Sequence, residues 1–332
     1  MNPTEPGGGT GVLERRDGES AAAGPGRVPA PNPARGPGPG AAPDPTLGPV
    51  LGPASPWLAP AKLNLCLHIV GRRPDGYHLL QTAIQFIDLC DELRFYRRER
   101  GRIERVAGPA EIPAEEDLVL RAARLLASRH EVPSGVAIAL NKRIPMQAGL
   151  GGGSSDAATV LLALNRLWGL GLSREQLADL GLSLGADVPV FVHGQAAWVE
   201  GIGERLTPVN FSAGVYLVLE PGVRVSTASI FQDSELTRNS PVTTIRAFLS
   251  GAGRNDCAAT VRRRYPEVAE ALDFIGKFGN ARLTGTGACV FAAMPDERAA
   301  RAVLAQSPAR WRGHVVHGLN RSPALDHPAL GR

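Results

Sequence analysis

The stretch Pro145-Met-Gln-Ala-Gly-Leu-Gly-Gly-Gly-Ser-Ser155 runs directly into a segment, residues 156–168, that has the apolar spacing of a helix. Its apolar positions recur at i, i+3, i+4 and i+7 and are Ala157, Val160, Leu161, Leu164, Leu167 and Trp168. Glycines let a ligand approach bare backbone N–H groups, and the first N–H groups of a helix lack partners within it. With the positive end of the helix dipole, these groups predict an anion site suited to a phosphate chain.

Residues 145–155, called the glycine loop below, do not match the common phosphate-binding patterns. The Walker A pattern G-x-x-x-x-G-K-[ST] is absent from the chain, and the glycine spacing of a Rossmann turn breaks at Ser154. A flexible turn capped by serine remains open as an alternative. The residues of the expected anion site are those of the loop itself: Pro145, Met146, Gln147, Ala148, Gly149, Leu150, Gly151, Gly152, Gly153, Ser154 and Ser155.

Upstream of the loop, residues 60–69 alternate apolar and polar side chains, which predicts a half-buried strand. Lys62 and Asn64 lie side by side on its polar face, and from this pattern alone Lys62 is a solvated surface residue. Downstream, Asp187 stands two residues before Pro189, where the chain must leave helical geometry. From the turn alone, its carboxylate is expected to cap the chain or to join a buried ion pair.

The other patterns indicate a mixture of strands and helices, and hence an α+β protein with a domain boundary near residue 210. The expected strands are residues 77–95, 136–140, 188–193, 196–199, 215–220, 282–292 and 313–318. The expected helices are residues 117–128, a helix that opens at Ser173 with Gln176 as its capping-box partner, and residues 243–249, 258–278 and 296–305.

Composition mainly excludes classes of protein. Of the first 55 residues, 24 are proline or glycine and none is aromatic, so we expect a disordered extension there. The chain has 36 Lys and Arg against 32 Asp and Glu, an excess too small to indicate nucleic acid. Its four cysteines form no C-x-x-C pair, and apolar runs stay shorter than the roughly 18 residues of a membrane span. We therefore expect a cytoplasmic protein with no nucleic acid and no membrane among its partners.

Five motifs in order carry a resemblance to a known family. They are Pro60-Ala-Lys-Leu-Asn-Leu65, Asp75-Gly-Tyr-His78, Gly149-Leu-Gly-Gly-Gly-Ser-Ser155, Leu184-Gly-Ala-Asp-Val-Pro-Val-Phe191 and Leu283-Thr-Gly-Thr-Gly-Ala-Cys-Val-Phe291. The glycine loop alone resembles the nucleotide-binding motif of the GHMP kinases, the superfamily of galactokinase, homoserine kinase and mevalonate kinase. Together the five resemble the branch that acts on 4-diphosphocytidyl-2-C-methyl-D-erythritol, over about residues 57–326.

The resemblance implies an architecture and a reaction. After the extension of residues 1–55, it implies a ribosomal-S5-like ATP-binding domain over residues 56–210 and a ferredoxin-like domain over residues 211–326. It implies a small-molecule kinase that transfers phosphate from ATP to the 2-hydroxyl of that substrate in the non-mevalonate route to isoprenoids. ATP and Mg²⁺ are the implied cofactors, the protein ligands of Mg²⁺ being unassigned.

The same resemblance gives roles to the residues that flank the loop. Asp187 is implied as the catalytic base that accepts the proton of the acceptor alcohol. Lys62 is implied to lie beside it, to keep it ionised and to stabilise charge on the transferred group. Asn64 would bind the substrate or the aspartate, and the glycine loop with Lys142 would bind ATP.

For the base of the substrate, the resemblance implies that Tyr77 stacks on the cytosine ring and that His78 hydrogen-bonds the base edge. Phe231 would cover the other face of the ring, with Thr227 nearby. Each stacked face contributes about 1–3 kcal/mol. The residues alone leave open a core role for Tyr77 and Phe231 and a surface position for His78.

Three further positions carry expectations from the same comparison of motifs. The turn of residues 283–288 resembles a superfamily motif that supports the glycine loop from behind. Asp117 stands where relatives often carry asparagine, so adenine contacts there are not assigned. Asp156, at the start of the expected helix, either helps to bind Mg²⁺ or complements the helix dipole.

Two rival functions remain open from the sequence. Another GHMP kinase would act on homoserine or a mevalonate-type alcohol, which has no use for the aromatic clamp of Tyr77, His78 and Phe231. A non-catalytic nucleotide-binding or ribonucleoprotein module would fit the S5-like fold, but it would not need both Lys62 and Asp187.

Overall fold

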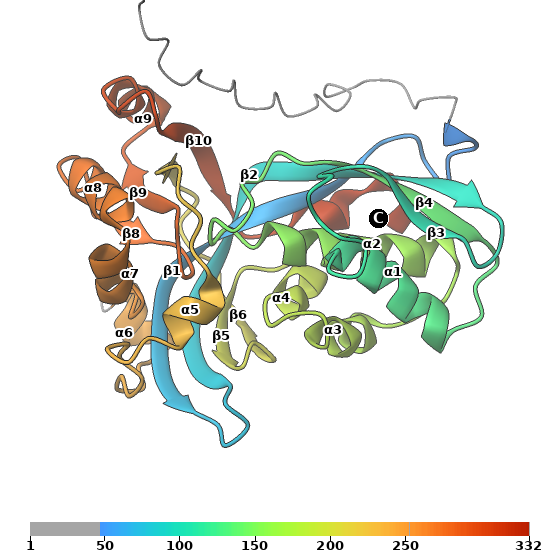
Figure 1. The fold of residues 1–332 in the computed structure, drawn as a ribbon, viewed down its shortest axis with the longest axis horizontal. Coiled ribbons are helices and arrows are strands. Elements are labelled where there is room, and N and C mark those ends of the chain that lie inside the picture. Colours follow the sequence, from blue (N-terminus) through green and yellow to red (C-terminus); the bar gives the residue numbers. More distant parts are fainter. Residues whose placement is uncertain (1–46, 252, 332) are drawn as a thin grey trace, which may run out of the picture. The chain divides into compact units, whose positions relative to one another are not determined.

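A long antiparallel hairpin, β1 (Trp57–Arg72) and β2 (His78–Arg98), is the central feature of the computed structural model, which describes residues 47–251 and 253–331 (Figure 1). The strand expected over residues 60–69 is present within β1. It is buried on both faces rather than half-buried. Its polar face is covered because the glycine loop lies along it: the carbonyl of Leu150 accepts a hydrogen bond of 3.0 Å from the backbone N–H of Lys62.

The hairpin belongs to the sheet of the N-terminal half. The other strands of that sheet are β3 (Ile103–Ala107), β4 (Gly135–Asn141), β5 (Ala197–Gly201) and β6 (Arg205–Pro208). β2 pairs with β1, β4 and β5, while β3 pairs with β4 in parallel and β6 with β5. The helices that pack on this sheet are α1 (Leu118–Arg129), α2 (Gly152–Leu167), α3 (Arg174–Leu182) and α4 (Val188–His193), as Figure 1 shows. The sheet therefore carries the start of α2 on the same side as α4.

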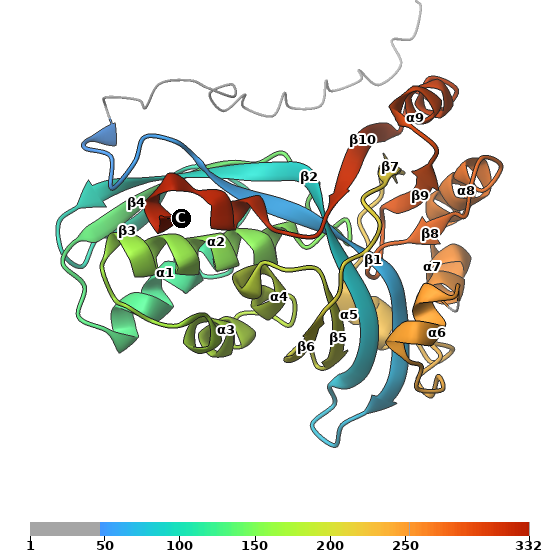
Figure 2. The same cartoon turned by 180° about the vertical axis from the view of Figure 1, so that it is seen from behind.

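The C-terminal half has a second antiparallel arrangement. Its strands, in spatial order, are β10 (Arg312–Leu319), β7 (Val215–Glu220), β9 (Val290–Met294) and β8 (Arg282–Leu283). Its helices are α5 (Thr227–Phe231), α6 (Ile245–Leu249), α7 (Ala258–Arg264), α8 (Pro266–Ile275) and α9 (Glu297–Leu304). α7, α8 and α9 lie on one side of the strands (Figure 1). β10 pairs with β7 and, through Gly318 and Leu319, with β2, so it joins the two halves (Figure 2).

Three expected elements differ from the structure. Residues 188–193 form helix α4 instead of a strand, because a short run that is buried all round has no period to separate the two. The helix expected over residues 258–278 is divided into α7 and α8 at Tyr265, since the following Pro266 disfavours helical geometry in the residue before it. The strand expected over residues 282–292 is divided into β8 and β9 by the turn that contains Gly285 and Gly287.

Other local expectations are confirmed. In α3, Ser173 Oγ accepts from the N–H of Gln176 and the Gln176 side chain accepts from the N–H of Ser173, which is the capping box predicted there. The extension expected over residues 1–55 lies mostly outside the described residues. Its end does not: Val50 bridges to Tyr96, and Leu51 N donates to the carbonyl of Phe95 at 2.8 Å. Residues 49–51 therefore add backbone hydrogen bonds to the free edge of β2.

Candidate active site

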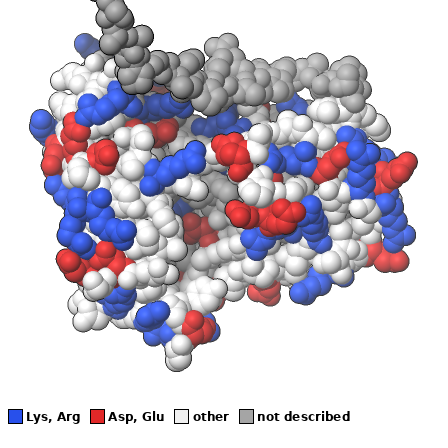
Figure 3. Space-filling model, viewed as in Figure 1, with Lys and Arg blue, Asp and Glu red and all other residues white. Residues whose placement is uncertain are grey.

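A cavity of about 700 Å³ lies beside the glycine loop. Its walls come from β1, the start of α2, the segment that leads into α1, residues 186 and 187, the start of α5 and the turn at residues 285 and 286. On the face drawn in Figure 3, the molecule is hollowed, and basic and acidic side chains are interspersed around the hollow. The cavity therefore collects residues that are far apart in the chain.

Most of the residues singled out from the sequence line this cavity. These are Lys62, Asn64, Lys142, Pro145, Met146, Gln147, Ala148, Gly149, Leu150, Gly151, Gly152, Gly153, Ser154, Asp187, Thr227 and Phe231. Three others do not line it. Ser155 is fully buried behind the loop, His78 is part-buried, and Tyr77 is 60% exposed at the tip of the β1–β2 hairpin.

Gly149 is held in a conformation and a space that only glycine fits. Its φ is +77°, and a Cβ there would lie 2.1 Å from the carbonyl oxygen of Thr284. Its own carbonyl accepts hydrogen bonds of 3.0 Å from Lys62 Nζ and from Thr284 Oγ1. The glycine loop is thus clamped between β1 and the turn at residues 284–287.

The start of α2 offers the donors that an anion site needs. α2 begins at Gly152, four residues earlier than the sequence pattern predicts, with Gly151 as its N-cap at a φ of +71°. No side chain of the described residues caps this end, so the first amides of the helix stay available. A Cβ on Gly152 would lie 3.0 Å from Lys142 Nζ, which shows how closely the backbone approaches that ammonium group.

Lys62 and Asp187 both line the cavity and form an ion pair there. Lys62 Nζ lies 3.5 Å from Asp187 Oδ2, donates to the Gly149 carbonyl and also donates to Asn64 Oδ1. The Lys62 side chain is only 3% exposed, whereas that of Asp187 is 36% exposed. Asp187 is the N-cap residue of α4 but makes no side-chain capping bond. Its carboxylate is therefore free to face a ligand while a buried cation holds it from behind.

Lys142 lies between two buried carboxylates. Its Nζ is 2.5 Å from Asp91 Oδ2 and 2.6 Å from Asp156 Oδ2. The other oxygen of Asp91 accepts from the backbone N–H groups of Arg143 and Ile144. Burial raises the pKa of Asp156 to about 8, although Lys142 opposes this shift. Burial would lower the pKa of Lys142, but the charges of Asp156 and Asp91 raise it overall.

A second group of side chains gathers around the end of α5. The rings of His78 and Phe231 stack with their centroids 4.8 Å apart. Arg238 holds both residues, because its Nε donates to His78 Nε2 at 3.2 Å and its Nη2 to the Phe231 carbonyl at 2.8 Å. Burial and then the charges of Arg238 and Arg72 lower the pKa of His78. Thr227 Oγ1 is 2.9 Å from Thr286 Oγ1, which ties the start of α5 to the second glycine-containing turn.

That turn, residues 283–288, supports the site as expected and adds residues that the sequence patterns missed. Thr284 Oγ1 accepts from the N–H of Asn64 at 3.1 Å and donates to the Gly149 carbonyl. Asn255 holds residues 283–288 in place, because its Nδ2 donates to the carbonyls of Leu283 and Gly285. Asp91 and Arg238 were missed as well. Composition contains one signal: only three of the 36 basic residues are lysine, and two of them, Lys62 and Lys142, lie here.

Asp117, the position where an asparagine was expected, also lines the cavity. Its carboxylate accepts from the N–H of Val119 as the cap of α1 and pairs with Arg105 at 2.6 Å. Both carboxylate oxygens are therefore engaged within the protein.

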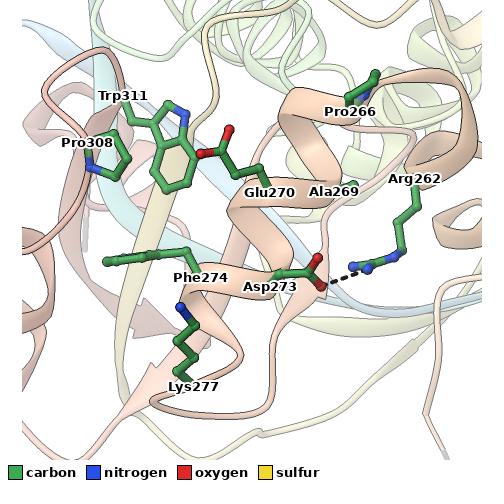
Figure 4. Close-up of a pocket in the computed structure, with 9 residues that line it drawn as sticks. All are labelled: Arg262, Pro266, Ala269, Glu270, Asp273, Phe274, Lys277, Pro308 and Trp311. Carbon is green, nitrogen blue, oxygen red and sulfur yellow. Dashed lines mark hydrogen bonds and ion pairs between the residues drawn. The ribbon is translucent and has the colours of Figure 1, made fainter.

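A second hollow of about 500 Å³ lies on α8 and contains none of the residues predicted for the site (Figure 4). Phe274 and Trp311 form its aromatic wall with ring centroids 5.5 Å apart, and Arg262 pairs with Asp273 at its edge. The glycine loop does not reach it.

Comparison with known proteins matches the two halves to two family descriptions. Residues 117–195 match the GHMP kinases N terminal domain, and residues 236–313 match the GHMP kinases C terminal domain. The first match includes the glycine loop, Lys142 and Asp187. The segment between the matches contains β5, β6, β7 and α5.

Relatives similar over nearly their whole length carry one name. The 4-diphosphocytidyl-2-C-methyl-D-erythritol kinase of Alkalilimnicola ehrlichii is 55% identical over 269 residues, 81% of this chain and 92% of that protein. The protein of the same name from Nitrosococcus oceani is 54% identical over 270 residues, 81% of this chain and 96% of that protein.

Solved structures agree with this. A crystal structure of 4-(cytidine 5'-diphospho)-2C-methyl-D-erythritol kinase is 36% identical, with a TM-score of 0.67 over 79% of this chain and 98% of that one. The Methanococcus jannaschii mevalonate kinase shares the fold at 15% identity, with a TM-score of 0.58 over 79% of this chain and 98% of that one. The chain therefore belongs to the GHMP kinases and, within them, to the family of the 4-diphosphocytidyl-2-C-methyl-D-erythritol kinases.

Proposed function

We propose that this chain transfers the γ-phosphoryl group of ATP to the 2-hydroxyl of 4-diphosphocytidyl-2-C-methyl-D-erythritol, giving the 2-phosphate and ADP in the non-mevalonate route to isoprenoid precursors. The observation that carries this proposal is the position of Asp187 and Lys62. They lie in one cavity, which the glycine loop and Phe231 also line. The relatives of the same family carry the name of a kinase for this substrate.

In this proposal the oxygen of the 2-hydroxyl bonds to the γ-phosphorus, and Asp187 accepts the proton of that hydroxyl. At the same time the bond between the γ-phosphorus and the bridging oxygen breaks, and ADP leaves. Lys62 acts in two ways. Its ammonium group pairs with the carboxylate of Asp187, and it stabilises the negative charge on the transferred group. Asn64 fixes the Lys62 ammonium and is itself held by Thr82 Oγ1, to which its Nδ2 donates at 2.8 Å. Most of the catalysis is thus positioning and electrostatics.

ATP would lie with its phosphates on the glycine loop and the first amides of α2, next to Lys142. The donor set also fits a Mg²⁺ ion that arrives with ATP. Asp156 lines the cavity, and its Oδ1 has no hydrogen-bond partner among the described residues. A carboxylate oxygen is a ligand that Mg²⁺ favours, with phosphates and water completing its shell. The ion would neutralise charge on the phosphates.

The cytidine end would lie beside α5. Phe231 offers a face for stacking and His78 a ring nitrogen for the base edge, while the exposed Tyr77 is available to cover the other face of the base. Thr227 lines the same part of the cavity.

Two further expectations belong to this proposal. The four cysteines are all buried and unpaired, which agrees with work in the reducing cytoplasm. Within residues 47–251 and 253–331, helices long and apolar enough to span a membrane are not found.

An ADP-release assay over a panel of alcohols tests the function. We expect turnover with the cytidyl substrate and at most trace turnover with homoserine or mevalonate. Preference for homoserine or mevalonate would assign the chain to another GHMP activity. Salt-sensitive RNA binding without ATP turnover would favour a ribonucleoprotein module instead.

A further inference from the structure

Arg224 differs from the other cations of the cavity in its pairing. Three basic side chains line the cavity: Lys62, Lys142 and Arg224. Lys62 lies against Asp187, and Lys142 lies between Asp91 and Asp156. Arg224 makes no ion pair or hydrogen bond with any of the described residues. Of the three cations that line the cavity, Arg224 is thus the one whose charge is not paired with a carboxylate of the described residues.

The charge balance of the cavity makes that cation important. Five acidic side chains line the same cavity, and they are Glu111, Glu116, Asp117, Asp156 and Asp187. Three lining cations face these five acids, yet both proposed ligands are polyanions. Each cation that points at phosphate oxygens offsets part of the repulsion between the acidic side chains and the polyanionic ligands.

Local structure explains why Arg224 is directed into the cavity. After β7, Val225 is buried in the core of the C-terminal half, and Val223 packs partly against the same core. Arg224 lies between these two valines and is exposed, so its side chain points away from that core. Arg224 thus lines the cavity three residues before Thr227, which lines it as well.

We propose that Arg224 binds the diphosphate group of the cytidyl substrate. This inference rests on the proposed function, because the substrate of that reaction carries a diphosphate between the base and the reacting alcohol. With the base at Phe231 and the alcohol at Asp187, the diphosphate lies between them in the cavity that Arg224, Thr227 and Thr286 also line. A planar guanidinium suits phosphate oxygens, since it donates two parallel hydrogen bonds.

The γ-phosphate of ATP is the competing occupant, and the position of Arg224 argues against it. The triphosphate has its own donors in the first amides of α2 and in Lys142. Arg224 belongs to the segment that also supplies Thr227 and Phe231, which are on the cytidine side. Arg224 is therefore assigned to the diphosphate of the cytidyl substrate and not to the triphosphate of ATP.

The test compares two probes that differ only in their phosphates, cytidine and cytidine 5′-diphosphate. Their dissociation constants are measured by calorimetry for the full chain, for Arg224→Ala and for Arg224→Lys. Arg298→Ala, which removes an exposed arginine of α9, is the matched control. We expect Arg224→Ala to weaken diphosphate binding about 10- to 100-fold and to leave cytidine binding unchanged. Arg224→Lys should recover part of the loss, and the control should behave as the unaltered chain.

The possible outcomes separate this inference from the function on which it rests. Equal weakening of both probes, or of neither, overturns the role of Arg224 in diphosphate binding. A raised KM for ATP with unchanged diphosphate affinity overturns it in favour of the γ-phosphate. If the unaltered chain binds neither probe, the proposed function itself fails.

Discussion

Lys62 Nζ lies 3.5 Å from Asp187 Oδ2 and donates a 3.0 Å hydrogen bond to the carbonyl of Gly149. One ammonium group thereby joins the carboxylate proposed as the base to the backbone of the phosphate-binding loop. The loop continues into α2 and Asp187 is the residue before α4, so the same contact links the starts of two helices. The reacting groups are in this way positioned by β1, on which Lys62 lies.

Replacing Lys62 by methionine removes this link while it keeps an unbranched side chain. We expect kcat to fall at least about 100-fold, because the transferred group loses its electrostatic stabilisation. ATP binding, measured by calorimetry, should change much less. Lys277→Met is the matched control, since Lys277 is exposed at the end of α8. A kcat within twofold of the unaltered chain would remove Lys62 from the reaction.

Gly149→Ala tests the clamp on the glycine loop. The new Cβ would lie 2.1 Å from the Thr284 carbonyl, so the loop or the second turn must shift. We expect a loss of about 2–4 kcal/mol in the free energy of unfolding together with weaker ATP binding.

Gly169→Ala is the control for Gly149→Ala, because Gly169 has a similar φ of +69° but a Cβ there would meet no atom within 4 Å. It should cost only the backbone strain, about 1–2 kcal/mol, and leave ATP affinity unchanged. Equal effects of the two substitutions on ATP binding would show that the contact with Thr284 does not shape the site.

Asp91→Asn tests the buried carboxylate behind Lys142. Asp91 is fully buried and accepts from Lys142 and from two backbone amides. The amide removes its charge and leaves Lys142 with one partner, so we expect a loss of about 3–5 kcal/mol in denaturant unfolding. Asp88→Asn, on the same strand, breaks only an exposed pair with His317 and should cost less than about 1 kcal/mol. Comparable losses of unfolding free energy for Asp91→Asn and Asp88→Asn would show that the buried pair of Asp91 and Lys142 contributes no more to stability than the exposed pair.

The protonation of His78 gives a pH-dependent prediction. Burial, with the charges of Arg238 and Arg72, lowers its pKa below the ordinary 6.5. Between the lowered pKa and 6.5, the unfolded chain binds a proton that the folded chain does not. This residue's contribution to stability therefore rises with pH across that window and is lost as pH falls.

Imidazole NMR titration measures that pKa directly. Arg238→Ala removes a nearby positive charge and should raise the pKa of His78 toward 6.5. Because Arg238 also holds His78 and Phe231, the substitution should raise the KM for the cytidyl substrate more than the KM for ATP. A pKa at or above 6.5 in the unaltered chain would contradict the arrangement described here.

The sequence predicts best what local pattern determines. The glycine loop, the helix after it and the capping box of Ser173 and Gln176 all depend on neighbours within one or two turns. The short buried run of α4 could not be assigned, because its burial on all sides leaves no period to read.

Local sequence patterns could not identify residues whose partners lie far away in the sequence. Asp91 lies 51 residues before Lys142, and Thr284 lies 220 residues after Asn64. Lys62 was expected on the surface from the strand pattern, and only the covering of β1 by the glycine loop buries it. The motif resemblance identified Lys62 and Asp187, but their separation and the hydrogen bond from Lys62 to the Gly149 carbonyl follow from the fold alone.

The most direct test of the account is single-turnover phosphoryl transfer by Asp187→Asn, with ATP and the cytidyl substrate both saturating. Asparagine keeps the shape of the side chain but cannot accept the proton. We predict that the rate of transfer falls about 10²- to 10⁴-fold while the dissociation constant for ATP stays within a few-fold of the original. A near-normal rate of transfer would contradict the assignment of Asp187 as the base, and with it the reaction geometry proposed for this cavity.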